Sequence, residues 1–404
     1  MKYAIIIPDG AADFPLEVLD GKTPFEAARK PHTDALAIEG RLGVVHTTPR
    51  GFSAGSDVCS MSLLGYDPAV YHTGRAPLEA AAMGIETGLT DTIFRCNLVT
   101  AVEGMMSDHS AGHIPSPEGR KLLEDFASLL AERGMADGIT FYPGVSYRNI
   151  MVDRSERDYG DLNTVPPHDV PGEPIKKHLP KGGPNAKLIQ DMIAASEELF
   201  ADHEVNTTRR ELNESPATHV WLWGCGNRPD IPPFNEVYGL KGAMITAVDL
   251  LAGIAALIGW DRLDVPGITG YHDTDYAAKG RYACGALDVY DLVCVHVEAP
   301  DEASHQADAT TKVASIEAID KHIVGPVVEK LRTFDEGWRL LYLPDHYTCV
   351  HDRKHDATPP PFMMVGTGVA KLRELPMSEA NAKESGLEIE FGHELMEYFL
   401  RSGT

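Results

Sequence analysis

Three apolar runs of the chain, each of strand length, are followed at once by acidic residues. The runs, each with the acids that follow it, are Tyr3–Ile7 with Asp9, Leu292–Val297 with Glu298 and Asp301, and Arg339–Leu343 with Asp345. In a parallel sheet flanked by helices, side chains that follow the carboxyl ends of the strands meet at one edge, where ligands bind. Because these runs come from opposite ends of the chain, we expect a single core built from both ends.

Short β-branched runs alternate with helix-length amphipathic segments, a pattern typical of α/β proteins with a largely parallel sheet between helices. The middle of the chain differs, because it has polar loops, a Pro-rich stretch at 165–172 and an amphipathic helix expected near Ala186–His203. We therefore expect residues 1–86 and 217–404 to form a core and residues 87–216 to form an inserted α/β cap domain.

The chain carries 36 Lys and Arg residues against 60 Asp and Glu residues, a formal net charge of −24 over 404 residues. Such a charge repels polyanions, so nucleic acid and an anionic membrane surface are not expected as partners. The longest apolar stretch, Gly242–Trp260, contains Asp249 and is expected to be a core helix rather than a membrane span. The six cysteines form no CxxC pair and no signal-like segment precedes the first strand, so we expect a reduced, cytoplasmic setting.

Metal-type side chains follow two of the predicted strands. In a helix, Asp301 and His305 share one face, as two ligands of one ion must, although a solvated Asp and a helix-terminal His would give the same letters. The adjacent side chains of Asp345 and His346 diverge, so each could reach a different ion, and His355 could complete a coordination sphere or lie in a surface loop. The full set is Asp9, Asp301, His305, Asp345, His346 and His355. Mixed carboxylate and imidazole ligands suit Mn²⁺ or Zn²⁺ better than Ca²⁺.

Ser56 follows a run of small residues and precedes an apolar helical pattern, so it lies at or near a helix N-terminus. One interpretation is a helix cap, since Ser is a preferred cap residue. The other is a nucleophile whose hydroxyl is deprotonated beside a bound cation, with free backbone N–H groups available to an anion. The order of residues alone leaves both interpretations open.

Several ordered motifs together resemble the archaeal type of cofactor-independent (2,3-bisphosphoglycerate-independent) phosphoglycerate mutases, within the alkaline phosphatase superfamily. The resemblance covers nearly the whole chain. The motifs are Pro8-Asp9-Gly10, Gly55-Ser56-Asp57-Val58, Met61 to Pro68, Thr73 to Ala81, Arg95-Cys96-Asn97, Thr269-Gly270-Tyr271, Asp301-x-x-x-His305, Asp345-His346 and Lys354-His355. The resemblance implies an alkaline-phosphatase-like core with an inserted cap, and two divalent ions, Mn²⁺ or Zn²⁺ with Mg²⁺ as an alternative.

The resemblance also implies the roles of individual residues. One ion is held by Asp301, His305 and His355, and the other by Asp9, Ser56, Asp345 and His346. Ser56 is then the nucleophile of an isomerase that interconverts 3-phosphoglycerate and 2-phosphoglycerate in glycolysis and gluconeogenesis. Phosphate passes to Ser56 and returns to the other hydroxyl of the glycerate, without 2,3-bisphosphoglycerate.

A substrate of this kind, a small phosphorylated acid, needs cationic partners. Guanidinium groups match phosphate and carboxylate in a bidentate manner, and Arg75, Arg95 and Arg148 lie in or beside motif-like stretches. Lys241 is a further candidate. A surface or structural role is the alternative for each of the four.

The motif from Ser107 to Ile114 departs from the mutase pattern, because His113 stands where the archaeal mutases are expected to carry Arg. Asp108 in the same motif is a candidate for substrate binding. A neutral imidazole is a weaker anion partner than Arg, and the stretch from Pro166 to Gly172 resembles a bacterial branch proposed to act as homoserine kinases. A homoserine kinase of the same fold is therefore the alternative function, and a catalytically silent metal-binding scaffold is a remote one.

Overall fold

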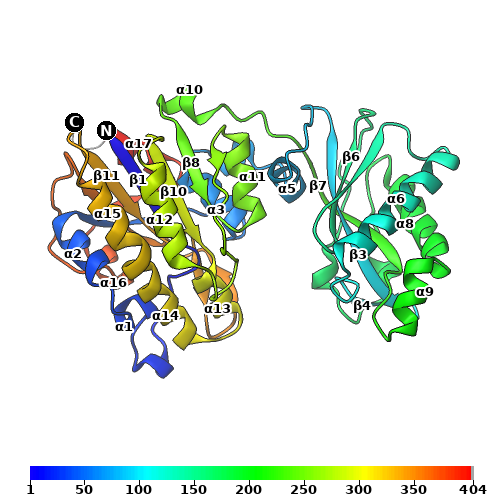
Figure 1. The fold of residues 1–404 in the computed structure, drawn as a ribbon, viewed down its shortest axis with the longest axis horizontal. Helices are drawn as coiled ribbons and strands as arrows, with labels where there is room; N and C mark the ends of the chain where they lie inside the picture. The colour runs from blue at the N-terminus through cyan, green and yellow to red at the C-terminus, as the bar shows by residue number, and fades with distance from the viewer. Residues whose placement is uncertain (402–404) are drawn as a thin grey trace. The chain divides into compact units, whose positions relative to one another are not determined.

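The computed structural model describes residues 1–401, which divide into two compact units (Figure 1). The first unit is Met1–His72 together with the chain from Ile231 onwards, and the second is Thr73–Asp230. The first unit is thus built from both ends of the chain.

An eight-stranded sheet forms the centre of the first unit, in the order β15-β2-β14-β11-β1-β10-β8-β9. The strands are β1 (Lys2–Pro8), β2 (Arg41–Val45), β8 (Gly242–Ile245), β9 (Asp261–Arg262), β10 (Leu292–Val297), β11 (Trp338–Tyr342), β14 (Pro361–Gly366) and β15 (Glu388–Ile389). β14 pairs antiparallel with both of its neighbours, and the other pairs are parallel. The predicted α/β class with a largely parallel sheet is confirmed.

Both faces of this sheet are buried. Ala4 and Ile6 of β1 belong to a core with residues of α15, whereas Ile5 and Ile7 point to the opposite face and are equally buried. A strand buried on both faces has a continuous apolar sequence, as β1 has. The helices of the unit are α1 (Pro24–Ala27), α2 (Pro31–Glu39), α3 (Ser56–Leu63), α4 (Pro68–Tyr71), α10 (Phe234–Tyr238), α11 (Asp249–Leu257), α12 (Tyr276–Ala286), α13 (Ala299–His305), α14 (Ala309–Ile319), α15 (Gly325–Leu331), α16 (Glu379–Glu384) and α17 (Glu394–Arg401).

The direction of the strands decides where the polar residues gather. Because β1, β10 and β11 are parallel neighbours, their carboxyl ends lie at one edge of the sheet. The segments that follow them carry Asp9, Asp301 and Asp345, and the loop after β2 leads from the same edge to α3. The hairpin of β12 (Tyr347–Cys349) and β13 (Lys354–Asp356) follows β11 there.

The second unit contains an antiparallel sheet in the order β4-β3-β6-β5, with β7 also pairing with β3. Its elements are α5 (Arg75–Ala82), β3 (Thr92–Val102), β4 (Met105–Asp108), α6 (Ser116–Glu132), β5 (Ile139–Pro143), β6 (Arg148–Asp153), α7 (Ile175–His178), α8 (Ala186–Ala201), α9 (Glu204–Glu211) and β7 (His219–Asn227). Phe126 of α6 and Ile193 of α8 pack in one core with Phe94 of β3.

The structure differs from the sequence-based expectations in two places. The range 87–216 lies inside the second unit but leaves out α5 and β7, whose apolar sequences would suit either unit and are placed by their packing on β3. The stretch Gly242–Trp260 is not one helix, because it forms β8 and then α11 with Asp249 in its first turn. Among the described helices, none is long and apolar enough to cross a membrane.

Candidate metal centre

The first group of candidate ligands is Asp301, His305 and His355. Helix α13 places Asp301 and His305 on one face, with Oδ2 of the carboxylate 3.1 Å from Nε2 of the imidazole. His355 extends from β13, and its Nε2 lies 3.4 Å from Oδ1 of Asp301 and 3.0 Å from Nε2 of His305. The structure thus brings together the three residues that the resemblance assigns to one ion.

The second group is Asp9, Asp345 and His346, and all three are buried. Nε2 of His346 lies 3.6 Å from Oδ1 of Asp9 and 3.4 Å from Oδ2 of Asp345. These two carboxylate oxygens have no hydrogen-bond partner among residues 1–401. The side chains of Asp345 and His346 therefore both lie beside Asp9, and His346 also lies close to Asp301 and His355 of the first group.

Hydrogen bonds fix which oxygen of Asp345 faces this group. Oδ1 accepts from the backbone N–H groups of Gly10 and His346, at 3.2 and 3.0 Å. Oδ2 of Asp345 takes no part in these hydrogen bonds and is available to another partner.

The buried negative charge of these carboxylates requires a compensating cation. Burial and the neighbouring carboxylates of Asp345, Glu298 and Asp301 raise the pKa of Asp9 well above its usual value. Burial alone would raise the pKa of Asp301 too, but hydrogen bonds with His305 and His355 hold it well below its usual range. Several carboxylates remain ionised in a buried site only beside compensating positive charge.

Backbone carbonyls orient two of the imidazoles. Nδ1 of His305 lies 2.9 Å from the carbonyl oxygen of Arg353, and Nδ1 of His355 lies 3.2 Å from that of Ala54. A carbonyl oxygen only accepts hydrogen bonds, so in the neutral rings Nδ1 carries the proton and Nε2 keeps its lone pair.

The hydroxyl of Thr348 orients the imidazole of His346 in the same way. Thr348 was not predicted from the sequence as a site residue. Its buried hydroxyl donates to Oδ1 of Asp301 at 2.5 Å and lies 3.1 Å from Nδ1 of His346. Because the hydroxyl proton goes to the carboxylate, the oxygen accepts from Nδ1–H of His346, which leaves Nε2 of that ring for an ion. The signal that could have identified Thr348 is its place two residues after His346, on the same side of an extended segment.

These residues fit a pair of divalent ions. Two buried carboxylate oxygens without partners lie beside His346, and Nε2 of His305 and of His355 lie beside Asp301. Carboxylate and imidazole donors suit Mn²⁺ and Zn²⁺.

Ser56 is the first residue of α3 and lies at this cluster. Its Oγ is 3.4 Å from Nε2 of His346, and the side chain is half-buried. The N-cap of α3 is Gly55, so the interpretation of Ser56 as a plain helix cap is wrong. The hydroxyl therefore faces the candidate metal ligands and lies beside the free N–H groups of a first helical turn.

Three of the predicted cationic residues gather in the second unit. Arg95, on β3, pairs with Oε1 of Glu79 at 2.7 Å, and its guanidinium stacks 4.0 Å from the ring centroid of Trp223. Burial lowers the pKa of Arg95, and so do the nearby charges of Arg75 and Arg148, whereas Glu79 opposes the shift. The charges of Arg75 and Arg148 thus act on Arg95 within the second unit.

The turn that carries Asp108 and His113 lies by the same residues. Asp108 accepts hydrogen bonds from the backbone of Ser110 and Gly112 at 2.7 Å, and so holds the turn together. The ring of His113 packs edge-on against Tyr147, with centroids 5.9 Å apart.

His168, which was not singled out as a site residue, belongs to this surface too. Its ring centroid lies 5.4 Å from that of Trp223 and 6.1 Å from that of His109. Burial lowers the pKa of His168, as do the charges of Arg95 and Arg75, while Asp169 opposes them. The signal was the Pro-rich stretch, whose prolines exclude a long α-helix, and in the structure His168 lies in the short 3₁₀ helix Pro167–Asp169.

The structure does not bring Lys241 to the metal cluster. Lys241 immediately precedes β8, and its Nζ lies 4.6 Å from the ring centroid of Tyr290 and 3.9 Å from Oδ2 of Asp261. Since β8 runs parallel to β10, Lys241 lies at the amino edge of the sheet, whereas Asp301 follows the carboxyl edge. A residue that precedes one strand and a residue that follows a parallel neighbouring strand lie at opposite edges of the sheet. This explains why Lys241 is not at the metal cluster.

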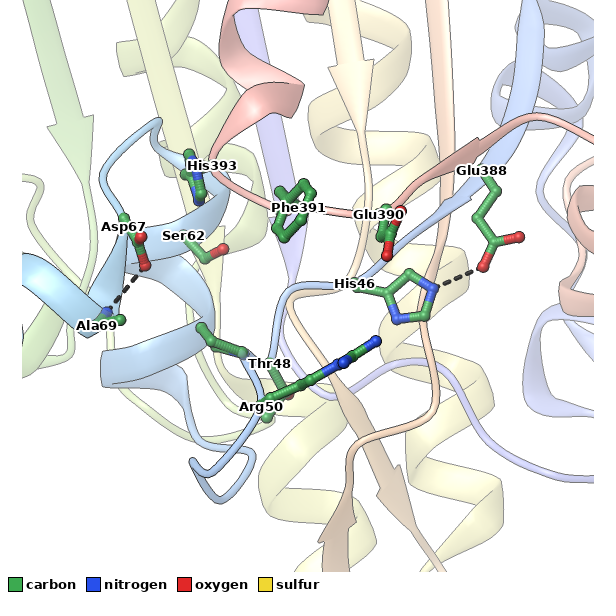
Figure 2. Close-up of a pocket in the computed structure, with 12 residues that line it drawn as sticks. His46, Thr48, Arg50, Ser62, Asp67, Ala69, Glu388, Glu390, Phe391 and His393 are labelled. Carbon is green, nitrogen blue, oxygen red and sulfur yellow. Dashed lines mark hydrogen bonds and ion pairs between the residues drawn. The ribbon is translucent and has the colours of Figure 1, made fainter.

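A separate pocket of about 640 Å³ lies elsewhere on the first unit, among the loop after β2, α3, α4 and the segment before α17 (Figure 2). Figure 2 shows His46 directed at Glu388, to which it is hydrogen-bonded at 2.6 Å, and Arg50 extending beside them. No member of the two ligand groups lines this pocket.

Comparisons with known proteins give a consistent result. A family model described as 2,3-bisphosphoglycerate-independent phosphoglycerate mutase matches residues 37–206. A protein of that name from Methanothrix thermoacetophila is 46% identical over 396 residues, 98% of each chain. The 2,3-bisphosphoglycerate-independent phosphoglycerate mutase 2 of Methanothermobacter thermautotrophicus is 45% identical and covers 99% of this chain and 97% of its own. A solved cofactor-independent phosphoglycerate mutase from Thermoplasma acidophilum is 25% identical, with a TM-score of 0.65 and 99% of each chain covered.

Proposed function

Because the chain belongs to the family of 2,3-bisphosphoglycerate-independent phosphoglycerate mutases, we propose that it interconverts 3-phosphoglycerate and 2-phosphoglycerate through a phosphoserine at Ser56. The observation that carries this mechanism is the position of the Ser56 hydroxyl, 3.4 Å from Nε2 of His346 within a cluster of metal-type side chains. The relatives named above are mutases and not kinases, so a homoserine kinase is not favoured. A silent scaffold is not favoured either, because the whole ligand set is retained.

In this proposal Asp301, His305 and His355 hold one divalent ion. Asp9, Ser56, Asp345 and His346 hold the second. Mn²⁺ or Zn²⁺ is the expected occupant, with Mg²⁺ as the alternative. When bound, such ions lower the pKa of a coordinated hydroxyl and offset negative charge on phosphoryl oxygens.

Ser56 acts as the nucleophile in the first of two in-line transfers. A bond forms between its Oγ, which gives up its proton, and phosphorus as the bond from phosphorus to O3 of the glycerate breaks and O3 takes up a proton. The glycerate then turns, its O2 gives up a proton and attacks the phosphoserine, and the bond to Oγ breaks as Oγ takes up a proton. The first turn of α3 supports the anionic group with its backbone N–H groups.

The second unit supplies the groups that bind the substrate. Arg75, Arg95 and Arg148 provide positive charge and planar hydrogen-bond donors for carboxylate and phosphate. Asp108 shapes the turn that presents His113 to the same ligand. Lys241 is left out of this proposal because it lies at the amino edge of the sheet.

We place the reaction in the cytoplasm, since all six cysteines are free thiols, as a reducing compartment would keep them. The expected partner is a small phosphorylated acid. Two divalent ions carry four positive charges, so a chain of net charge −24 can still have a locally cationic site.

The test is an assay of the protein with Mn²⁺ and 3-phosphoglycerate alone, against homoserine with a nucleoside triphosphate. Turnover of phosphoglycerate is expected, and label from ³²P-phosphoglycerate should appear on Ser56. The Ser56→Ala variant should lose both signals, whereas Ser53→Ala, in the same loop but exposed, should keep them. Covalent label that persists in Ser56→Ala would show that another residue is the nucleophile. Turnover of homoserine but not of phosphoglycerate would show that the protein is a homoserine kinase and not a mutase.

A further inference from the structure

His296 is a completely buried histidine in contact with Asp9. It lies on β10, and its Nε2 is 2.7 Å from Oδ2 of Asp9, the carboxylate whose Oδ1 faces His346. Its Nδ1 is 3.1 Å from the hydroxyl oxygen of Thr246, at the end of the neighbouring strand β8. The sequence did not single out either residue.

The Asp9 carboxylate selects the tautomer of this ring, because an ionised carboxylate only accepts hydrogen bonds. The hydroxyl oxygen of Thr246 already accepts from the backbone N–H of Val248 at 3.0 Å, and its one proton is free to be donated to Nδ1 of His296. Nε2 then carries the ring proton and donates it to Asp9, as a carboxylate acceptor requires. When Asp9 is ionised, as a metal ligand must be, the opposite tautomer would place a nitrogen lone pair 2.7 Å from a carboxylate oxygen.

His296 thus differs from the three imidazoles of the ligand groups. In the neutral rings of His305, His346 and His355, Nδ1 carries the proton and donates it to a protein oxygen. The lone pair of Nε2 is then available to an ion. In His296 the proton lies on Nε2, so this ring donates to a ligand and has no lone pair at that position.

We propose that His296, held in its Nε2–H tautomer by Thr246, is a positioning residue that fixes the Asp9 carboxylate with Oδ1 directed at the metal ion. The ammonium of the buried Lys279 donates to the carbonyl oxygen of His296 at 2.8 Å and holds this part of β10 in place. With Oδ2 accepting from His296, Oδ1 is the oxygen of Asp9 without a hydrogen-bond partner among residues 1–401 and is the one that would hold an ion. The inference rests on the proposed role of Asp9 as a metal ligand.

The alternative is that His296 is itself a ligand. Asp9, His296 and Glu298 also lie close enough to surround an ion, and Nε2 of His296 is 3.5 Å from Oε2 of Glu298. An ion there would require a lone pair on Nε2 of His296. The two assignments therefore differ in the position of one proton.

Long-range ¹H–¹⁵N correlation spectra of protein labelled with ¹⁵N-histidine report that proton, with and without Mg²⁺ as a diamagnetic ion. The His296 signals are assigned by their absence from His296→Gln or, should that variant not fold, by their shift in Thr246→Ser. We expect the Nε2–H pattern in both spectra. An Nδ1–H pattern, or loss of the Nε2 proton when the ion is added, would overturn the proposal.

Metal affinity supplies the second readout, by competition of Mn²⁺ with a chromogenic chelator. Thr246→Val should weaken one of the two sites about 10- to 100-fold, as loss of an outer hydrogen bond typically does, and Thr246→Ser should restore it. Thr100→Val, which removes a buried hydroxyl hydrogen bond in the second unit, is the matched control and should change neither site. Equal affinities in Thr246→Val and wild type would reject the positioning role, whereas wild-type protein that binds no ion would reject the proposed metal centre instead.

Discussion

Nε2 of His305 lies 3.0 Å from Nε2 of His355, so two ring nitrogens from segments 50 residues apart in the chain face each other. Two lone pairs at this distance repel, and a proton or a cation between them is required. Both nitrogens also lie within 3.4 Å of the carboxylate of Asp301. This relationship makes the metal content of the protein its most informative measurement.

Removal of the ions should abolish activity, and Asp301→Ala should lose one ion. Asp301 is the only carboxylate that touches both His305 and His355 among the described residues, so the two imidazoles alone should not retain the ion. Elemental analysis after dialysis should fall from about two ions per chain to about one in the variant, and mutase activity should fall with it. Asp308→Ala, an exposed acid just after the same helix, is the control. Full turnover in the presence of a strong chelator would contradict the two-metal proposal.

Metal affinity should rise with pH. The hydrogen bond to Asp301 raises the pKa of His305 to about 9, so in the metal-free protein this ring is protonated at neutral pH. An ion must displace that proton, and proton competition weakens as the pH rises through about 9. Titration with Mn²⁺ at several pH values below that point should show a steadily tighter complex, and a flat profile would contradict the assignment.

The same shift predicts the pH dependence of the chelated protein. A histidine whose pKa rises on folding stabilises the folded chain below its unfolded pKa of about 6.5, and this contribution is lost as the pH rises through about 9. In chemical denaturation with chelator, the difference in unfolding free energy between wild type and His305→Gln should be larger near pH 6 than above pH 9. A difference that grows with pH would have the wrong sign.

The sequence predicted the edge of the sheet where the ligands meet, because strand direction and the residues after Ile7, Val297 and Leu343 are local properties. It could not predict how the Asp345 carboxylate is oriented, since that depends on backbone hydrogen bonds from Gly10 and His346 to Oδ1 of Asp345.

Partners that come from distant segments were also not visible. Thr246 directly follows β8 and His296 lies on β10, and only the pairing of these two strands brings them together. Likewise, β7 has the same apolar character as the strands of the first unit, and only its pairing with β3 places it in the second. The position of Lys241 was not visible for a different reason: Gly242–Trp260 was expected to be one helix, so the strand β8 that begins directly after Lys241 was not recognised.

Gly10→Ala should weaken metal binding and destabilise the fold. Gly10 has φ of 57°, and a Cβ atom there would lie 2.6 Å from Oδ1 of Asp301 and would also clash with the hydroxyl of Thr348. The left-handed conformation and this crowding should lower the free energy of unfolding by about 1–3 kcal/mol. Gly21→Ala is the matched control, since Gly21 has φ of 76° and open space around its Cβ position. Equal metal affinity and stability in the two variants would show that the approach to Asp301 and Thr348 has no effect.

Arg95→Lys should raise KM for phosphoglycerate more than it lowers kcat. The Arg95 guanidinium is planar, stacks on Trp223 and pairs with Glu79, and a lysine can provide the charge but not the planar fork. If Arg95 binds the ground state and the transition state alike, the loss appears in KM. A loss of one charge-assisted hydrogen bond of about 1.5–3 kcal/mol corresponds to roughly a 10- to 150-fold change in KM. Arg133→Lys, an exposed arginine of the same unit paired with Glu198, should leave KM unchanged. A fall in kcat with KM unchanged would instead place Arg95 in contact with the transferred phosphoryl group in the transition state.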